Sequence, residues 1–368
     1  MQPRPEEFKA KVDSGCTVLI RETRNASVLL DCFRIFFMQL IIDDYGASVG
    51  KKGNRFLIRK KNSVEEFSAD QIEQIILVKA STLSTDAVKL AMSKHIDIVY
   101  LDWRGTPVGR IYPCKLGGTT LTRKRQLEAC FNGVGAEIVK KLIEAKIVNQ
   151  AYLLKSLAKS RKRKDFLITA KKMLSFSREV ASCSNDLEEI RDTLFGIEGN
   201  CANLYFSCLT DILPFEGRDR DGSDAVNSFL NYGYGILYSE IEKSCVLAGL
   251  DPYLGFFHTD RYGKPSMVLD LIEGFRPVVV DRSIITLFAQ KQVNETDFEA
   301  SKECSKRFLS KAGRSKIIDA VMGGLHAEVK RGNKQFSFQD EILKQSRLVA
   351  KKVLKPNSVE FEAFVHKW

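Results

Sequence analysis

The sequence has no uninterrupted apolar run of the roughly eighteen residues that a membrane-spanning helix needs. Its most apolar early segment, residues 28–42, is interrupted by Asp31 and Arg34. The same segment lacks the small-residue cleavage site of a secretory signal. We therefore predict a cytoplasmic protein with neither a membrane span nor an export signal.

Paired cysteines and several common enzyme motifs are also missing. The nine cysteines include no C-x-x-C pair, and their odd number argues against complete internal pairing, so reduced thiols are expected. There is no P-loop, dinucleotide-binding fingerprint or G-x-S-x-G elbow. These absences exclude NTPase, dehydrogenase, α/β-hydrolase and zinc-finger interpretations.

Positive charge is in excess. The chain has 57 Lys and Arg against 46 Asp and Glu, which gives a formal charge of +11. An acidic polymer is a plausible partner for such a chain, and nucleic acid is favoured over a membrane surface. A soluble protein that is merely basic is the alternative explanation of the charge.

The distribution of apolar residues predicts an α+β protein with two domains. Short runs such as QLIID, RFLIRKK, QIILV and IDIVYLD are separated by Gly, Asn and Asp, as in strands joined by turns. Between the last two runs, Ser84 or Thr85 is placed to cap a short helix. Residues 38–114 are therefore predicted to form a small, mostly antiparallel β-domain.

The rest of the chain is predicted to be a larger all-α domain at residues 126–368, after a linker at 115–125 that contains Gly117 and Gly118. From residue 126 onward the apolar residues mostly follow the three-and-four spacing of amphipathic helices. Residues 1–37 form an N-terminal extension to which we assign no function.

Residues 256–277 contain an inventory of metal ligands. His258 offers an imidazole, and Asp270 and Glu273 offer carboxylates on neighbouring turns of one helix face. Upstream, Glu198 follows an apolar stretch and precedes Gly199, which would let a ligand approach closely. Carboxylates in apolar surroundings cost several kcal/mol unless something positive lies beside them. The donors suit hard or borderline divalent ions; a core histidine and a solvated acidic face are the alternative.

Cations that could contact DNA occur in two loops. Four consecutive cations include Arg161, Lys162 and Arg163, with a solvated loop as the alternative. Arg218 and Arg220 lie in the polar loop EGRDRDGSDAVN, whose acid spacing does not match an EF-hand. We interpret that loop as facing DNA or capping a helix.

Two further residues are candidates for DNA contact. Tyr232 lies on a predicted helix, where an aromatic ring is usually in the core, although a tyrosine near a metal could stack on a base. Arg276 follows Glu273 by three residues and is placed either to neutralise a carboxylate or to hold a phosphate.

Several ordered motifs in the chain resemble one known family. These are KIVNQ (146–150), IEGNCANLYF (197–206), DAVNSFLNYGYGILY (224–238) and FFHTDRYGKPSMVLDLIEGFRPVVVDR (256–282). Together they resemble the CRISPR-associated integrase and endonuclease that acquires new spacers. The stretches STDAVKL and IDIVYLDWRGTPVG are similar to the N-terminal β-domain of that family. The resemblance runs from Met38 to the helical tail, and residues 1–37 have no counterpart.

The resemblance implies a catalytic metal site in the helical domain. Its metal-binding and catalytic residues match Glu198, His258 and Glu273, with Mg²⁺ or Mn²⁺ as the ion. Asp270 matches a neighbouring acidic position that supports the ligands. Some relatives have Asp in place of Glu273, so this side chain would reach one methylene further.

The resemblance also implies how the protein works with its partners. It implies a homodimer that forms a heterohexamer with a small CRISPR-associated partner, in which two dimers flank a partner dimer. This assembly would act on double-stranded and branched DNA and insert short fragments into the repeat array through a 3′ hydroxyl. A stand-alone structure-specific nuclease on branched DNA and a non-catalytic DNA-binding scaffold are the alternatives.

Overall fold

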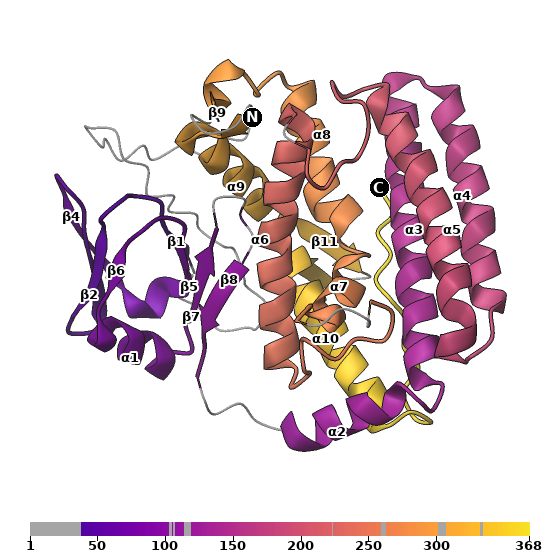
Figure 1. The fold of residues 1–368 in the computed structure, drawn as a ribbon, viewed down its shortest axis with the longest axis horizontal. Coiled ribbons are helices and arrows are strands. Elements are labelled where there is room, and N and C mark those ends of the chain that lie inside the picture. Colours follow the sequence, from indigo (N-terminus) through magenta and orange to yellow (C-terminus); the bar gives the residue numbers. More distant parts are fainter. Residues whose placement is uncertain are drawn as a thin grey trace, which may run out of the picture. The chain divides into compact units, whose positions relative to one another are not determined.

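The computed structural model describes residues 38–368 apart from gaps at 103–104, 106, 114–118, 223, 259–262, 301–306 and 332–333. The predicted N-terminal extension therefore lies outside the described residues. The chain divides into two compact units between Ile98 and Val99 (Figure 1). None of the helices in the described ranges is both long and apolar enough to cross a membrane.

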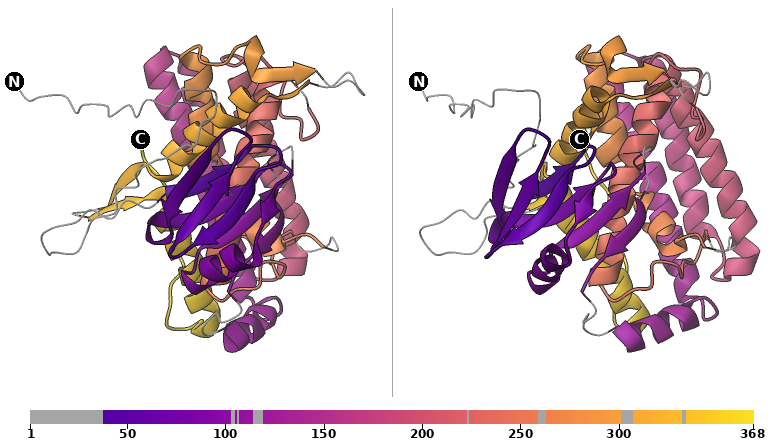
Figure 2. Two further views of the ribbon diagram at one scale, coloured as in Figure 1. Left: turned by 90° about the vertical axis from the view of Figure 1, so that its left-hand side faces the viewer. Right: turned by 60° about the vertical axis from the view of Figure 1, so that its left-hand side comes forward.

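The first unit is built from short strands (Figure 2). Its strands and helices are β1 (Met38–Ile42), β2 (Ser48–Lys52), β3 (Arg55–Arg59), β4 (Val64–Ser68), η1 (Ala69–Gln71), β5 (Ile72–Leu77), β6 (Thr82–Leu83), α1 (Thr85–Ser93) and the start of β7 (Asp97–Leu101). One sheet of this unit has the order β4-β3-β2-β6, and in a further sheet β1 pairs with β5. Strand β8 (Pro107–Ile111) lies in the second unit. The β2–β3 and β3–β4 pairs are antiparallel, whereas β1–β5 and β2–β6 are parallel, so both orientations occur.

Local sequence explains the hairpin and the helix of this unit. Gly53 begins the two-residue turn between β2 and β3 with φ +60, a backbone conformation that favours glycine. Phe56 and Ile58 point into the core from alternate positions of β3 and are fully buried. Ser84 caps α1 by accepting a hydrogen bond from the backbone N–H of Ala87 at 3.2 Å, which confirms the predicted cap.

The second unit is mostly helical, and its elements follow β8 in order. They are α2 (Thr119–Ala129), α3 (Val134–Arg161), α4 (Lys164–Ser182), α5 (Leu187–Thr210), α6 (Ala225–Leu247), α7 (Ser266–Ile272), η2 (Arg276–Asp281), α8 (Arg282–Ala289), η3 (Glu295–Asp297), β9 (Phe298–Ala300), β10 (Arg307–Leu309), α9 (Lys311–Leu325), β11 (Glu328–Arg331), β12 (Lys334–Ser337) and α10 (Phe338–Leu354). Strands followed by a mainly helical region confirm the predicted α+β class.

The helices of this unit are arranged around α6. Helices α3, α4 and α5 lie side by side, while α7, η2, α9 and α10 contact α6 (Figure 1). The approach of η2 to α6 is close at Gly233, where an added Cβ would lie 2.7 Å from Val280. Strand β8 is also fastened to α6, because Arg110 donates to Glu242 at 3.1 Å and to Ser239 Oγ at 2.9 Å.

Two details of the predicted second half are wrong. The predicted linker at 115–125 is helical from Thr119 onward. This helix, α2, was not predicted because its sequence is almost entirely polar and shows no apolar periodicity. The unit is also not all-α, because β9 pairs with β10 and β11 pairs with β12 in antiparallel hairpins. Strands of three or four residues are too short to give a clear period-two pattern.

The segment η2 is a π-helix between α7 and α8. The backbone N–H of Arg282 donates to the carbonyl of Pro277, five residues earlier. Pro277 has no N–H of its own, so it favours a disturbance of the regular helical ladder here. Single π-turns of this kind often occur at functional sites, and η2 carries Arg276 at one end and Asp281 at the other.

The C-terminal tail packs against α3 and the segment after α7. Asn149 donates to the carbonyls of Gly274 at 2.8 Å and Phe364 at 3.0 Å, and accepts from the N–H of His366 at 2.8 Å. The Phe364 ring stacks on Phe275 with a centroid distance of 5.5 Å. The tail is therefore part of the core beside residues 273–276.

This packing predicts that Phe364→Ala destabilises the protein. Removing a buried phenyl ring costs about 3 kcal/mol in lost burial and cavity formation. Chemical denaturation followed by far-UV circular dichroism measures the loss. Val365→Ala is the matched control, because Val365 is 38% exposed and should change the free energy of unfolding by less than about 0.5 kcal/mol. Equal effects of the two substitutions would contradict the structural role of the tail.

Candidate metal and nucleic-acid site

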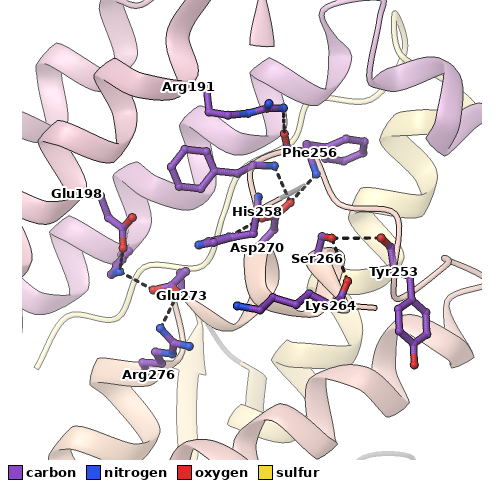
Figure 3. Close-up of polar contacts among 12 residues, drawn as sticks. Arg191, Glu198, Tyr253, Phe256, His258, Lys264, Ser266, Asp270, Glu273 and Arg276 are labelled. Atoms are coloured by element: carbon purple, nitrogen blue, oxygen red, sulfur yellow. Dashed lines mark hydrogen bonds and ion pairs between the residues drawn. The ribbon is translucent and has the colours of Figure 1, made fainter. Parts of the chain in front are cut away.

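Glu198 and Glu273 come from different helices and meet at one lysine. Glu198 lies in α5, and Glu273 directly follows α7. Lys146, on the buried face of α3, forms ion pairs with both: its Nζ contacts Glu198 Oε1 and lies 2.5 Å from Glu273 Oε2. Arg276 Nη1 donates to the other oxygen of Glu273 at 2.6 Å. Figure 3 shows these contacts as a continuous chain from Glu198 to Arg276.

Asp270 organises the loop that carries His258. Its carboxylate accepts hydrogen bonds from the backbone N–H groups of Phe256 at 2.7 Å, Phe257 at 3.1 Å and His258 at 3.1 Å. The same carboxylate contacts His258 Nδ1 at 2.8 Å (Figure 3). Asp270 is 3% exposed. These donors replace the hydrogen bonds that its carboxylate would otherwise make to water. The contact with Nδ1 orients the imidazole and directs Nε2 to other partners.

Aromatic packing relates the His258 ring to helix α5. Phe195, one turn before Glu198, stacks on Phe257 with a centroid distance of 4.1 Å. The imidazole ring lies at 77° to the rings of Phe195 and Phe257, with centroid distances of 5.9 and 4.9 Å. The ring is therefore held both by a carboxylate and by apolar contacts.

The charges of the glutamate cluster keep each other ionised. Burial raises the pKa of Glu273, but the neighbouring Arg276 and Lys146 outweigh it and bring the pKa down to about 2. Burial lowers the pKa of Lys146, and the two glutamates outweigh it so that the net shift is upward. Each group thus depends on its oppositely charged neighbour to stay charged in the interior.

A second polar network, formed by Tyr205, Tyr234 and Asp281, adjoins Arg276. The hydroxyls of Tyr205 and Tyr234 donate to Asp281 at 2.8 and 2.6 Å, inside the core. Burial raises the pKa of Asp281 to about 6, and the tyrosine hydrogen bonds and nearby arginines oppose this only in part. The guanidinium groups of Arg276 and Arg218 pack on the Tyr234 ring at 5.0 and 5.4 Å from its centroid.

The model of the family described as CRISPR associated protein Cas1 matches residues 40–322. The chain belongs to the Cas1 family. The family resemblance of the sequence motifs is thereby confirmed.

Relatives in the Cas1 family are similar over much of the chain. The CRISPR-associated endonuclease Cas1 1 of Archaeoglobus fulgidus is 31% identical over 90% of this chain and 100% of its own length. The CRISPR-associated endonuclease Cas1 2 of Saccharolobus solfataricus is 35% identical over 65% of this chain and 72% of its own length.

Solved structures share the fold at lower identity. A casposase bound to an integration product matches with a TM-score of 0.79 and 22% identity, covering 90% of this chain and 94% of that chain. A CAS1 protein from Thermotoga maritima matches with a TM-score of 0.70 and 21% identity, covering 88% and 99%.

The donor types implied by the Cas1 resemblance fit a divalent ion, since two carboxylates and an imidazole suit Mg²⁺ or Mn²⁺. A positive charge is already required between Glu198 and Glu273, where the ammonium of Lys146 stands. In the observed conformation, the described part of the chain contains no group of three His, Cys, Asp or Glu side chains close enough to hold a metal. The structure thus brings Glu198 and Glu273 together through Lys146 and holds His258 through Asp270.

Two of the three predicted DNA-binding arginines near the site, Arg218 and Arg276, are engaged inside the protein. Arg276 neutralises Glu273, one of the two roles predicted for it. Arg218 donates to Asn227 Oδ1 at 3.0 Å and Asn231 Oδ1 at 2.6 Å, which fixes the loop before α6. Arg220 is exposed. Contact of these three arginines with DNA stays a prediction.

The position of Tyr232 contradicts the predicted contact of this residue with DNA. Its side chain is 1% exposed and its ring packs so closely on Gly105 that an added Cβ there would lie 2.8 Å away. A ring buried in this way cannot stack on a base, so the predicted DNA contact at Tyr232 is wrong. The default interpretation of an aromatic residue on a helix, that it belongs to the core, was the right one here.

The basic run between α3 and α4 separates into two kinds of residue. Arg163 pairs with Asp165 at 2.5 Å and also contacts Asp211, so it joins the start of α4 to the end of α5. Lys162 is exposed and adopts a left-handed conformation with φ 55 at the end of α3, beside Arg161. The half-buried Arg161 and the exposed Lys162 and Lys164 are therefore the members of the run that remain available for phosphate.

The raised pKa of Asp281 predicts a pH effect on stability. Because its pKa rises from an ordinary 3.8 to about 6, the folded protein holds a proton that the unfolded chain releases between about pH 4 and pH 6. Stability should therefore fall as the pH rises through this window, by up to about 3 kcal/mol from this group. Asp281→Asn should flatten the fall.

Denaturant unfolding at several pH values between about pH 4 and pH 7 measures this effect. Asp192→Asn changes an exposed residue of α5 and should keep the wild-type profile. If Asp281→Asn and the wild type lose stability in parallel across the window, the assigned proton is not on Asp281.

Proposed function

We propose that this protein is the DNA integrase and endonuclease of CRISPR adaptation, which inserts short DNA fragments into the repeat array. Support comes from its membership in the Cas1 family and from relatives named CRISPR-associated endonucleases. The observation that carries the proposal is the meeting of Glu198 and Glu273, two residues singled out by the family motifs, at one buried cation beside His258.

In this proposal Glu198, His258 and Glu273 would hold one Mg²⁺ or Mn²⁺, which supplies Lewis-acid polarisation of the scissile phosphodiester when bound. Asp270 keeps His258 in place through Nδ1 and leaves Nε2 as the ligand atom. Arg276 balances the charge of Glu273 and fixes its rotamer from the η2 side. The tail and Asn149 support the same segment through Gly274.

The proposed reaction is a transesterification. The 3′ hydroxyl of the incoming fragment attacks a phosphorus of the repeat, a new P–O bond forms and the bond to the departing 3′ oxygen breaks. The hydroxyl proton is released to solvent, the departing strand end takes up a proton, and no nucleotide cofactor is needed. Water in place of the 3′ hydroxyl gives cleavage at the same centre, as in a stand-alone nuclease acting on branched DNA.

The proposed assembly is a homodimer that joins a small CRISPR-associated partner in a heterohexamer. A solved complex described as Cas6-RT-Cas1–Cas2 contains a chain with a similar fold, at a TM-score of 0.74 and 19% identity. Double-stranded and branched DNA are the proposed substrates, in line with the net charge of +11.

The first test of the proposal is strand transfer. Labelled DNA with a free 3′ hydroxyl is incubated with a repeat-containing target, the partner protein and Mn²⁺, and products are separated on a denaturing gel. Glu198→Gln, His258→Ala and Glu273→Gln should each lower joined product by at least about 100-fold, because each removes a ligand of the proposed ion.

Glu188→Gln, an exposed acid near the start of the same helix α5, is the matched control and should join DNA like the wild type. Cutting without joining by the wild type would favour the stand-alone nuclease. DNA binding without any product, with or without divalent ion, would favour the non-catalytic scaffold. Equal joining by wild type and all three variants would move the chemistry elsewhere.

The second test concerns the basic run. A double Arg161→Ala and Lys162→Ala variant should bind DNA more weakly and lower the salt dependence of log Kd by up to about 2, since each lost phosphate contact removes about 0.9. Arg163→Ala is the control from the same run, and it should mainly lower stability because Arg163 pairs with Asp165 and Asp211. A double variant with the wild-type salt slope would show that Arg161 and Lys162 do not contact DNA phosphates.

A further inference from the structure

Lys146 occupies the position where a bound cation would share the two glutamates. Lys146 is 6% exposed. Its ammonium is held by the carboxylates of Glu198 in α5 and of Glu273 directly after α7. A buried ammonium is costly unless it is paired well. Here the pairing also keeps Glu198 and Glu273 from repelling one another.

Lys146 and Arg276 together engage both oxygens of Glu273. Lys146 lies 2.5 Å from Oε2, while Arg276 donates to Oε1 at 2.6 Å. A divalent ion shared by Glu198 and Glu273 would lie where the Lys146 ammonium now lies between them, and two cations so close together repel each other. Of the two, only Lys146 contacts both glutamates, so it is the cation that a shared ion would displace.

We propose that Lys146 is a positioning residue that holds Glu198 and Glu273 together in the metal-free protein and competes with the metal ion for them. This inference rests on the proposed metal site. The ammonium leaves its contact with at least one glutamate when the ion binds, and the two carboxylates are already close when the ion arrives.

The local structure restricts the movement to the side chain. Asn149, one turn further along α3, ties that helix to Gly274 and to the tail through hydrogen bonds of 2.8 and 3.0 Å. The α3 backbone and the segment carrying Glu273 are thus joined independently of Lys146. A lysine is suited to such an exchange because its single charge sits on a flexible four-carbon stem, unlike the planar fork of an arginine.

The test is Mn²⁺ binding by the full chain, measured by isothermal titration calorimetry, together with the melting temperature with and without Mn²⁺. Lys146→Met removes the charge and keeps an unbranched side chain. It should melt at a lower temperature without metal, bind Mn²⁺ about tenfold more tightly, and gain more in melting temperature from Mn²⁺ than the wild type. Lys159→Met, at an exposed position on α3, should behave like the wild type in all three measurements.

Each result decides for or against the competition. A folded Lys146→Met protein that binds Mn²⁺ as the wild type does, or more weakly, overturns it and leaves the proposed metal site intact. Binding by Lys146→Met alone supports strong competition. If neither protein binds Mn²⁺, either alone or with DNA present, the proposed metal site fails and this inference fails with it.

A crystal structure of the wild type grown with Mn²⁺ keeps the inference testable if Lys146→Met does not fold. The expected structure has the ion on Glu198 and Glu273, with Lys146 Nζ no longer in contact with both. An ion bound there while Lys146 still bridges both carboxylates would overturn the proposal.

Discussion

The site is organised by the ion pairs that neutralise one buried carboxylate, that of Glu273. Glu273 is 2% exposed, and an unpaired charge at such a position would cost several kcal/mol. Lys146 from α3 and Arg276 from η2 supply the compensation, and Lys146 in turn draws in Glu198 from α5. The position of each helix in this part of the unit is therefore tied to the same set of charges.

Arg276 connects this set to a second buried acid. It packs on Tyr234, whose hydroxyl donates to Asp281, and Arg218 packs on the same ring while it fixes the loop before α6. The π-helix η2 makes the connection possible, since it carries Arg276 and Asp281 at its two ends. Glu273, Arg276, Tyr234 and Arg218 thus form a series of consecutive contacts between the glutamate cluster and the loop before α6.

The sequence allowed the acids to be predicted better than their partners. Glu198, Asp270 and Glu273 stand beside apolar residues, and this placement correctly indicated that Glu198 and Glu273 need a positive charge nearby, which Lys146 supplies. Asp270 is instead satisfied by backbone N–H groups and His258 Nδ1. Lys146 carries the same signal, because it lies between Ile143 and Ile147 on the apolar face of α3, where a lysine also needs a partner. Asp281 follows three valines and was not predicted as part of a polar network. Its partners are Tyr205 and Tyr234, which are distant from it in the sequence.

Other features could not be predicted from a single sequence. The polar helix α2 has no apolar stripe, and the β9–β10 and β11–β12 hairpins are shorter than any pattern that periodicity can distinguish. The internal use of Arg218, Arg276 and Arg163 depends on which carboxylates and rings the fold brings to them. A net charge records how many cations there are, and only the fold separates those that stabilise the interior from those that face a phosphate.

The charges of the glutamate cluster bear on how the proposed ion and DNA would bind. Lys146 and Arg276 balance Glu198 and Glu273, so these four residues carry no net charge in the absence of an ion. A divalent ion added to them would leave an excess of two positive charges in poorly solvated surroundings, and that excess is unfavourable until anions approach. The phosphates of DNA are such anions. The same buried balance on which the proposed competition by Lys146 rests would therefore favour binding of such an ion together with DNA over binding of the ion alone.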